Sequence, residues 1–201
     1  MNVETQNQTG RRKAVWGARV SIVLAFACVS AMIGCGQAVR QGEGNSYLIL
    51  SSLLGASGGP IVQSDVVTAT GGILPDTGLA TFLLAMKDPQ GPGPTDVNSI
   101  TITQYHVEYV RSDGRNTPGV DVPFAFDGGL TQTVSAGGTS FSFTLVRIQA
   151  KEEAPLKAMK SGGGADVITT TARVTFYGHD QSGRGVSVTG NLEVSFADWA
   201  G

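Results

Sequence analysis

The most regular pattern in the chain is an alternation of apolar and polar residues near its C-terminal end. The apolar residues share one parity and polar residues separate them, at Val186, Val188, Leu192, Val194 and Phe196. Residues 168–176 alternate in the same way, and the segment 179–185 between the two runs contains Gly183 and Gly185. Such a pattern predicts two strands, each with one wet face, joined by a hairpin loop.

Two further runs change parity along their length. In Ser99–Arg111, Ile100 and Ile102 have one parity, whereas Tyr105, Val107 and Tyr109 have the other. A change of parity within one strand predicts a β-bulge, here near Thr103-Gln104. The run Phe141–Ala150 changes parity likewise, between Leu145 and Val146.

Four weaker strands are predicted from β-branched and apolar runs between Gly, Pro and Asp residues, at 47–54, 61–68, 79–87 and 130–134. The best helical segment is short, Glu152–Lys160. About seven or eight strands with frequent turn signals predict an all-β domain, a two-sheet β-sandwich over residues 46–201.

The N-terminal region has a different pattern. A polar start that ends in Arg11-Arg12-Lys13 precedes an apolar run, Val20–Gly34. This run is shorter than the ~20 residues that span a bilayer, so residues 1–34 are predicted to be a signal peptide. Residues 35–45, which are mostly small and polar, are predicted to form a short flexible tether.

The apolar run closes as Ala31-Met32-Ile33-Gly34-Cys35, which resembles the lipobox of bacterial lipoproteins. The resemblance implies that Cys35 receives a diacylglycerol and that cleavage precedes it. It also implies a lipid-anchored protein of the bacterial cell envelope. Gly36 favours the outer membrane or the periplasmic face. An ordinary cleaved signal and an uncleaved anchor are the alternatives.

Composition limits the partners. Removing the leader's four basic residues and one acidic residue from totals of 14 and 16 leaves 10 basic and 15 acidic residues, a net charge near −5. An acidic body argues against nucleic acid and against anionic headgroups. Cys28 and Cys35 are the only cysteines, so the body has no disulfide. About 150 residues bury enough core without one.

Two stretches resemble known β-sandwich families. Ile102–Tyr109 followed by Asp113-Gly114 resembles the third strand of fibronectin type III modules. The Val174–Phe196 hairpin is similar to the closing hairpin of bacterial immunoglobulin-like repeats. These resemblances imply an immunoglobulin-like sandwich.

The segment Gly55-Ala56-Ser57-Gly58-Gly59-Pro60 resembles the nucleophile segment of chymotrypsin-like serine proteases and satisfies G-x-S-x-G. A nucleophilic serine needs a histidine within hydrogen-bond reach. Both histidines follow Ser57, and the next residues predict a strand rather than a helix. We therefore interpret the segment as a Gly-rich turn between the first two strands, with a hydrolase based on Ser57 as the less favoured alternative.

Metal sites are weakly indicated. His106 and Glu108 share one face of a strand, but a tetrahedral site requires three or four ligands. Asp113, Asp127 and Asp180 lie near glycines, as in calcium loops, yet Asp-Gly is also what tight turns require. We expect no metal and no cofactor.

The long loop Asp113–Gly129 carries Phe124, Phe126 and Asp127, which we predict as a candidate partner-binding loop. Tyr105 and Tyr109 share parity with Val107 and are expected in the core. The sequence favours a non-catalytic envelope module, not an enzyme, that binds a protein or glycan partner or has a structural role. A carbohydrate-binding module is the main alternative.

Overall fold

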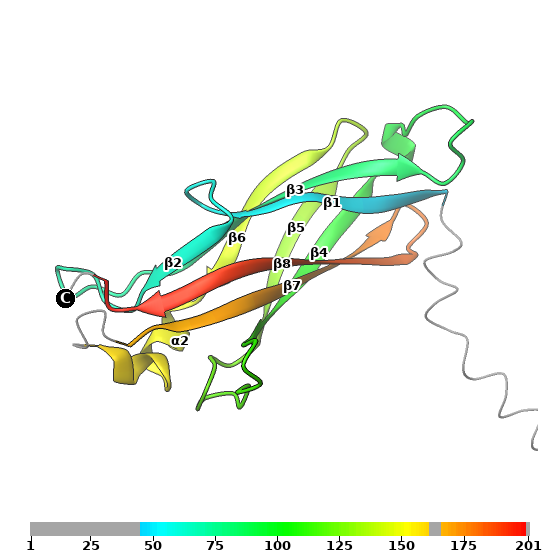
Figure 1. The fold of residues 1–201 in the computed structure, drawn as a ribbon. Coiled ribbons are helices and arrows are strands. Elements are labelled where there is room, and N and C mark those ends of the chain that lie inside the picture. The colour runs from blue at the N-terminus through cyan, green and yellow to red at the C-terminus, as the bar shows by residue number, and fades with distance from the viewer. Residues whose placement is uncertain (1–44, 161–165, 200–201) are drawn as a thin grey trace, which may run out of the picture. The chain divides into compact units, whose positions relative to one another are not determined.

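The strands form where β-branched and aromatic residues alternate with polar ones. The computed structural model describes residues 45–160 and 166–199 (Figure 1). It contains β1 (Ser46–Gly55), β2 (Ile61–Asp65), β3 (Asp76–Met86), β4 (Ile100–Val110), β5 (Phe126–Val134), β6 (Thr139–Val146), β7 (Ile168–Asp180) and β8 (Gly185–Ala197). Each of the eight runs predicted as a strand overlaps one of these strands, so the prediction of an all-β, two-sheet structure is confirmed.

The strands are divided between two sheets. A three-stranded sheet has the order β1-β3-β6, and a five-stranded sheet has the order β2-β8-β7-β4-β5. Neighbouring strands are antiparallel except for β2, which runs parallel to β8. The chain therefore changes sheets between β1 and β2, two strands that follow each other in sequence (Figure 1).

The core between the sheets is centred on Phe176 of β7, which is fully buried. Its ring meets Phe82 of β3 edge-on at a centroid distance of 5.0 Å and Phe143 of β6 at 5.2 Å. Tyr105 of β4 also packs against Phe143, at 5.2 Å. Edge-to-face aromatic pairs add to the stabilisation from burial alone, so this cluster joins the two sheets.

The predicted bulge in β4 is confirmed. The pairing of β4 with both β5 and β7 shifts between Ile102 and Gln104. The extra residue lets Ile102 and Tyr105, which have opposite parity, both face the core. Tyr105 and Tyr109 are 5% and 2% exposed, which confirms that they are core residues.

The second parity change has another cause. β6 ends at Val146, and a helix, α2 (Ile148–Glu152), follows it. The run Phe141–Ala150 is therefore not one bulged strand, and Ala150 is buried from a helix.

The predicted helical segment Glu152–Lys160 is only partly right. It contains just the last residue of α2 and the 3-10 helix η3 (Leu156–Met159). Pro155 separates the two because proline lacks the N–H that a continuous helix would need. A second 3-10 helix, η2 (Asp96–Asn98), precedes β4.

Residues 1–44 lie outside the described part of the chain, so the predicted signal peptide, Cys35 and nearly all of the predicted tether have no structural account. Among the residues that are described, no helix is both long enough and apolar enough to cross a membrane.

Candidate functional site

Ser57 lies in the turn that connects β1 with β2. Gly58 adopts a positive φ of 80° and donates its N–H to the carbonyl of Gly55 at 2.8 Å. Gly55 in turn donates to the carbonyl of Gly59 at 2.8 Å. A strand follows the turn, so the interpretation as a Gly-rich turn is confirmed.

The two histidines have other partners. His106 Nδ1 lies 2.9 Å from Asp127 Oδ1, and His179 Nδ1 lies 3.1 Å from the carbonyl oxygen of Asp180. In the five-stranded sheet, β8 and β7 lie between β2, which follows the turn, and β4, which carries His106, so three strand spacings of ~4.8 Å, about 14 Å in all, separate His106 from β2. His179 is on β7, two such spacings from β2, and its row is eight residues from that of Ile61. Within the described chain, Ser57 has neither histidine as a general base.

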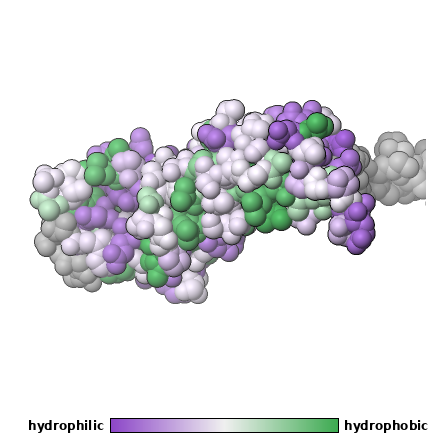
Figure 2. All heavy atoms as spheres, turned by 90° about the horizontal axis from the view of Figure 1, so that it is seen from above, coloured by the Kyte–Doolittle hydropathy of each residue, from purple (hydrophilic) through white to green (hydrophobic). Residues whose placement is uncertain are grey.

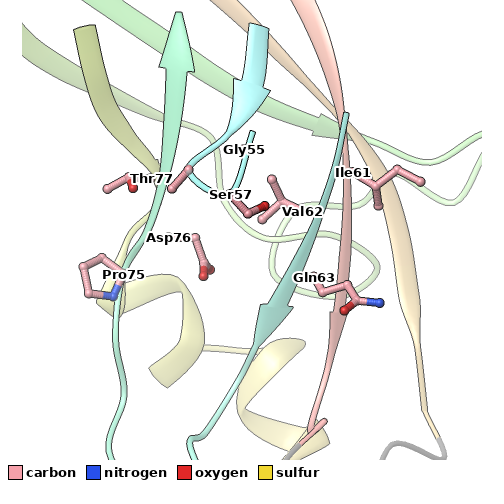
Figure 3. Close-up of a pocket in the computed structure, with 9 residues that line it drawn as sticks. Gly55, Ser57, Ile61, Val62, Gln63, Pro75, Asp76 and Thr77 are labelled. Carbon is pink, nitrogen blue, oxygen red and sulfur yellow. The ribbon is translucent and has the colours of Figure 1, made fainter. Parts of the chain in front are cut away.

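A pocket of about 540 Å³ opens beside this turn, between β2 and the beginning of β3 (Figure 3). Its lining combines hydroxyl, amide and carboxylate groups with apolar side chains, from Gly55, Ala56, Ser57, Ile61, Val62, Gln63, Pro75, Asp76 and Thr77. Asp76 and Ser57 lie on opposite sides of the space between the two strands (Figure 3). We call this the end pocket.

The carboxylate of Asp76 is neutralised from inside the protein. Lys151 of α2 is 1% exposed, and its Nζ lies 2.8 Å from Asp76 Oδ2. Nζ also donates to the carbonyls of Asp65 at 2.8 Å and Leu74 at 2.7 Å. Ser64 Oγ donates to the same carboxylate oxygen at 2.6 Å. The end pocket therefore presents a carboxylate whose charge is already balanced.

This geometry limits what Lys151 can do chemically. An ammonium group has three hydrogens, and all three are directed at acceptors. Nitrogen in this state has no lone pair for nucleophilic attack. Lys151 therefore connects α2, β2, β3 and the segment before β3, and does not act as a nucleophile.

Sequence reasoning did not find Lys151. The residue begins the charged stretch Lys151-Glu152-Glu153, which is typical of a solvated surface. The sequence alone gives no indication that Asp76 and the carbonyls of Asp65 and Leu74 lie beside Lys151, because each is 75 or more positions away.

Tyr109 makes a buried polar link between the two sheets. Its hydroxyl donates to the carbonyl of Leu145 in β6 at 2.7 Å. Burial raises the pKa of this phenol well above its usual range, and the negative charge of Asp76 raises it further. The group therefore stays protonated and remains a donor.

The predicted partner-binding loop is shorter than expected. Phe126 and Asp127 belong to β5, so placing them in a loop that extends to Gly129 was wrong. Phe126 is 9% exposed and meets Tyr105 edge-on at 6.2 Å. Gly128, interpreted as a turn residue, lies against the Tyr105 ring, where a Cβ atom would overlap it.

Phe124 does lie in the loop and is 45% exposed. Its ring covers Gly119, which has a φ of 75° and no room for a side chain. Asp127 is exposed, and the hydrogen bond from His106 lowers its pKa. Of the three predicted residues, two therefore remain accessible to a partner.

The outer face of the three-stranded sheet has an unusual composition. Its outward positions, which alternate with buried ones, are Tyr47, Ile49, Ser52, Leu54, Thr77, Leu79, Thr81, Leu83, Ala85, Ser140, Ser142 and Thr144. None of these is charged, and Tyr47 and Leu83 are 45% and 41% exposed. Figure 2 shows hydrophobic side chains gathered in patches as this sheet is seen from above. We call it the uncharged face.

The outer face of the five-stranded sheet is polar. Arg173 Nη1 lies 3.3 Å from Glu108 Oε2, and His106 pairs with Asp127. Threonine hydroxyls meet across strands, as in Thr175 and Thr189 at 2.9 Å. We call this the polar face; its exposed aromatic residue is Tyr177, 42% exposed.

The residues that the structure describes contain no group of three or more His, Cys, Asp or Glu side chains placed to hold a metal ion. No protein-family model and no curated protein matches the sequence.

Proposed function

We propose that this chain is a lipid-anchored protein of the bacterial cell envelope whose β body is a non-catalytic binding or structural module. The observation that carries the binding role is the uncharged face. Apolar groups exposed together on a sheet, without charges among them, are typical of surfaces that contact another molecule.

The anchor is supported by the resemblance of Ala31–Cys35 to a lipobox. The body after Cys35 contains no other cysteine, so no disulfide competes for this thiol. The body is acidic, which makes electrostatic attachment to anionic lipids a poor substitute for an acyl chain.

An immunoglobulin-like architecture is supported by the strand order. If β1, β3, β4, β6, β7 and β8 are taken as strands A, B, C, E, F and G, one sheet has the order A-B-E and the other contains G-F-C. β5 then corresponds to C′ beside C, and β2 to a second part of strand A that pairs parallel with G.

The anchor is tested by fractionating cells that express Cys35→Ser, with Cys28→Ser as the matched control. We expect the Cys35→Ser protein to lose labelling by a radioactive fatty acid and to enter the soluble fraction. The Cys28→Ser protein should stay labelled and membrane-bound. A Cys35→Ser protein that remains in the membrane with its leader intact would replace this proposal with a signal anchor.

Glycan binding is the second candidate, and Tyr177 favours it. This ring lies on the polar face, and its strand neighbours in register are Gln104 and Ser187. Aromatic rings beside amide and hydroxyl groups suit the apolar faces and hydroxyls of sugars. Binding on a glycan array that is lost in Tyr177→Ala, but kept in Phe124→Ala, would support a site there; no binding would exclude it.

A further inference from the structure

We propose that the uncharged face is a self-association surface, on which two copies of this chain stack their three-stranded sheets about a two-fold axis. The proposal rests on the binding role proposed above for this face and names its partner, and it stands whether or not Cys35 carries a lipid.

The charge distribution favours a second copy as the occupant. The chain without its leader has a net charge near −5, from 10 basic and 15 acidic residues, so two bodies repel each other over most of their surfaces. The uncharged face is a broad surface on which two copies can meet without burying a charge. Burying an unpaired charge is costly, and this contact avoids that cost.

The chemistry of the face is also self-complementary. Its polar positions are all Ser or Thr, namely Ser52, Thr77, Thr81, Ser140, Ser142 and Thr144. A hydroxyl both donates and accepts a hydrogen bond, so it can pair with another hydroxyl. A face of carboxylates or ammonium groups would instead need a partner of opposite charge. An identical face supplies both the apolar and the hydroxyl contacts.

The area matches a weak dimer. Three strands spaced ~4.8 Å apart and about ten residues long at ~3.4 Å each cover roughly 500 Å². Two copies would then bury about 1,000 Å² together, the lower end of specific interfaces. We expect a dissociation constant in the micromolar range.

An axis parallel to the strands would place both copies of Ser46, the first residue of β1, at the same end of the dimer. Both β bodies would then begin at the same end of the dimer, which is compatible with anchoring the two chains on one membrane. Attachment to a shared membrane would raise the effective concentration and favour a weak dimer.

The test is sedimentation equilibrium of the full chain, purified in detergent over about 1–100 μM, in wild type and in two variants. Tyr47→Glu places a charge on the uncharged face, and Tyr177→Glu places the same charge on the polar face at nearly equal exposure, 45% against 42%. Wild type and Tyr177→Glu should dimerise alike, and Tyr47→Glu should weaken the dimer at least about tenfold. Thermal unfolding of each variant checks that it is folded.

A second measurement does not depend on a disruptive charge. Thr81→Cys places a thiol on β3, the central strand of the uncharged face, and Thr171→Cys places one on β7, an inner strand of the polar face. Mild oxidation should link Thr81→Cys into covalent dimers and leave Thr171→Cys at the background of wild type. A monomeric wild type over the whole concentration range, equal effects of the two glutamates, or equal crosslinking of the two cysteines would overturn the proposal.

Discussion

The two sheets share one core but differ in where their charged residues lie. The strands of the three-stranded sheet contain one charged residue, Asp76, and it is paired with the buried Lys151. The five-stranded sheet places its charges outward, where His106 meets Asp127 and Arg173 meets Glu108. The Asp76–Lys151 ion pair is therefore buried and structural, whereas the ion pairs of the polar face are exposed to water.

The physical consequence is that losing one partner of an ion pair costs different amounts of folding free energy in the two regions. An exposed ion pair contributes little because water solvates both charges well when they separate. A buried charge that loses its partner has no such replacement. The comparison predicts that similar deletions of a basic side chain will have very different effects in the two regions.

The largest expected effect is that of Lys151→Ala. The change leaves Asp76 without its cation and the carbonyls of Asp65 and Leu74 without the Lys151 donor, and we expect the free energy of unfolding to fall by about 3–5 kcal/mol. Lys157→Ala, on the exposed side of η3, is the control and should change it by less than about 0.5 kcal/mol. Urea unfolding followed by circular dichroism measures both, and equal effects would break the comparison.

Tyr109→Phe should have the next largest effect. It removes the hydroxyl that links β4 to the Leu145 carbonyl in β6, and leaves that carbonyl without this buried donor. We expect a loss of about 1–3 kcal/mol in the same unfolding measurement. Tyr177→Phe, which removes an exposed hydroxyl, is the matched control. A loss as large in Tyr177→Phe would show that burial does not decide the cost.

Arg173→Ala tests the other side of the comparison. Arg173 and Glu108 have side chains that are 54% and 47% exposed. Removing the guanidinium should lower the free energy of unfolding by less than about 1 kcal/mol, and less again at high salt. A loss close to that of Lys151→Ala would mean that the polar face is held together by its ion pairs.

The smallest expected effect is a pH dependence confined to the polar face. The hydrogen bond from His106 lowers the pKa of Asp127, so this pair stabilises the folded state above the ordinary carboxyl pKa of about 3.9. The contribution is lost as the pH falls through the lowered folded-state value. NMR titration of the Asp127 carboxyl should show its pKa rise toward the ordinary range in His106→Gln. An unchanged pKa in that variant would remove His106 as the cause.

Local patterns explain how much of the fold could be predicted. Alternation along β7 and β8, and the parity change in β4, depend on neighbours within a few residues, and the eight strands and the bulge follow from them. The same reasoning failed at Phe126, where Asp127-Gly128-Gly129 has the composition of a turn. Gly128 instead gives the Tyr105 ring room to pack. It failed at Ala150 because a strand and a helix both bury alanine.

The sequence by itself determined the strands, the bulge, the acidic body and the candidate lipid attachment at Cys35, because these depend on short runs of residues or on composition. Only the tertiary structure decided that β2 joins β8, that Lys151 is buried against Asp76, and that the outward residues of β1, β3 and β6 form one uncharged face. These features bring together segments far apart in the chain. Their physical basis is a set of long-range contacts, which no local pattern encodes.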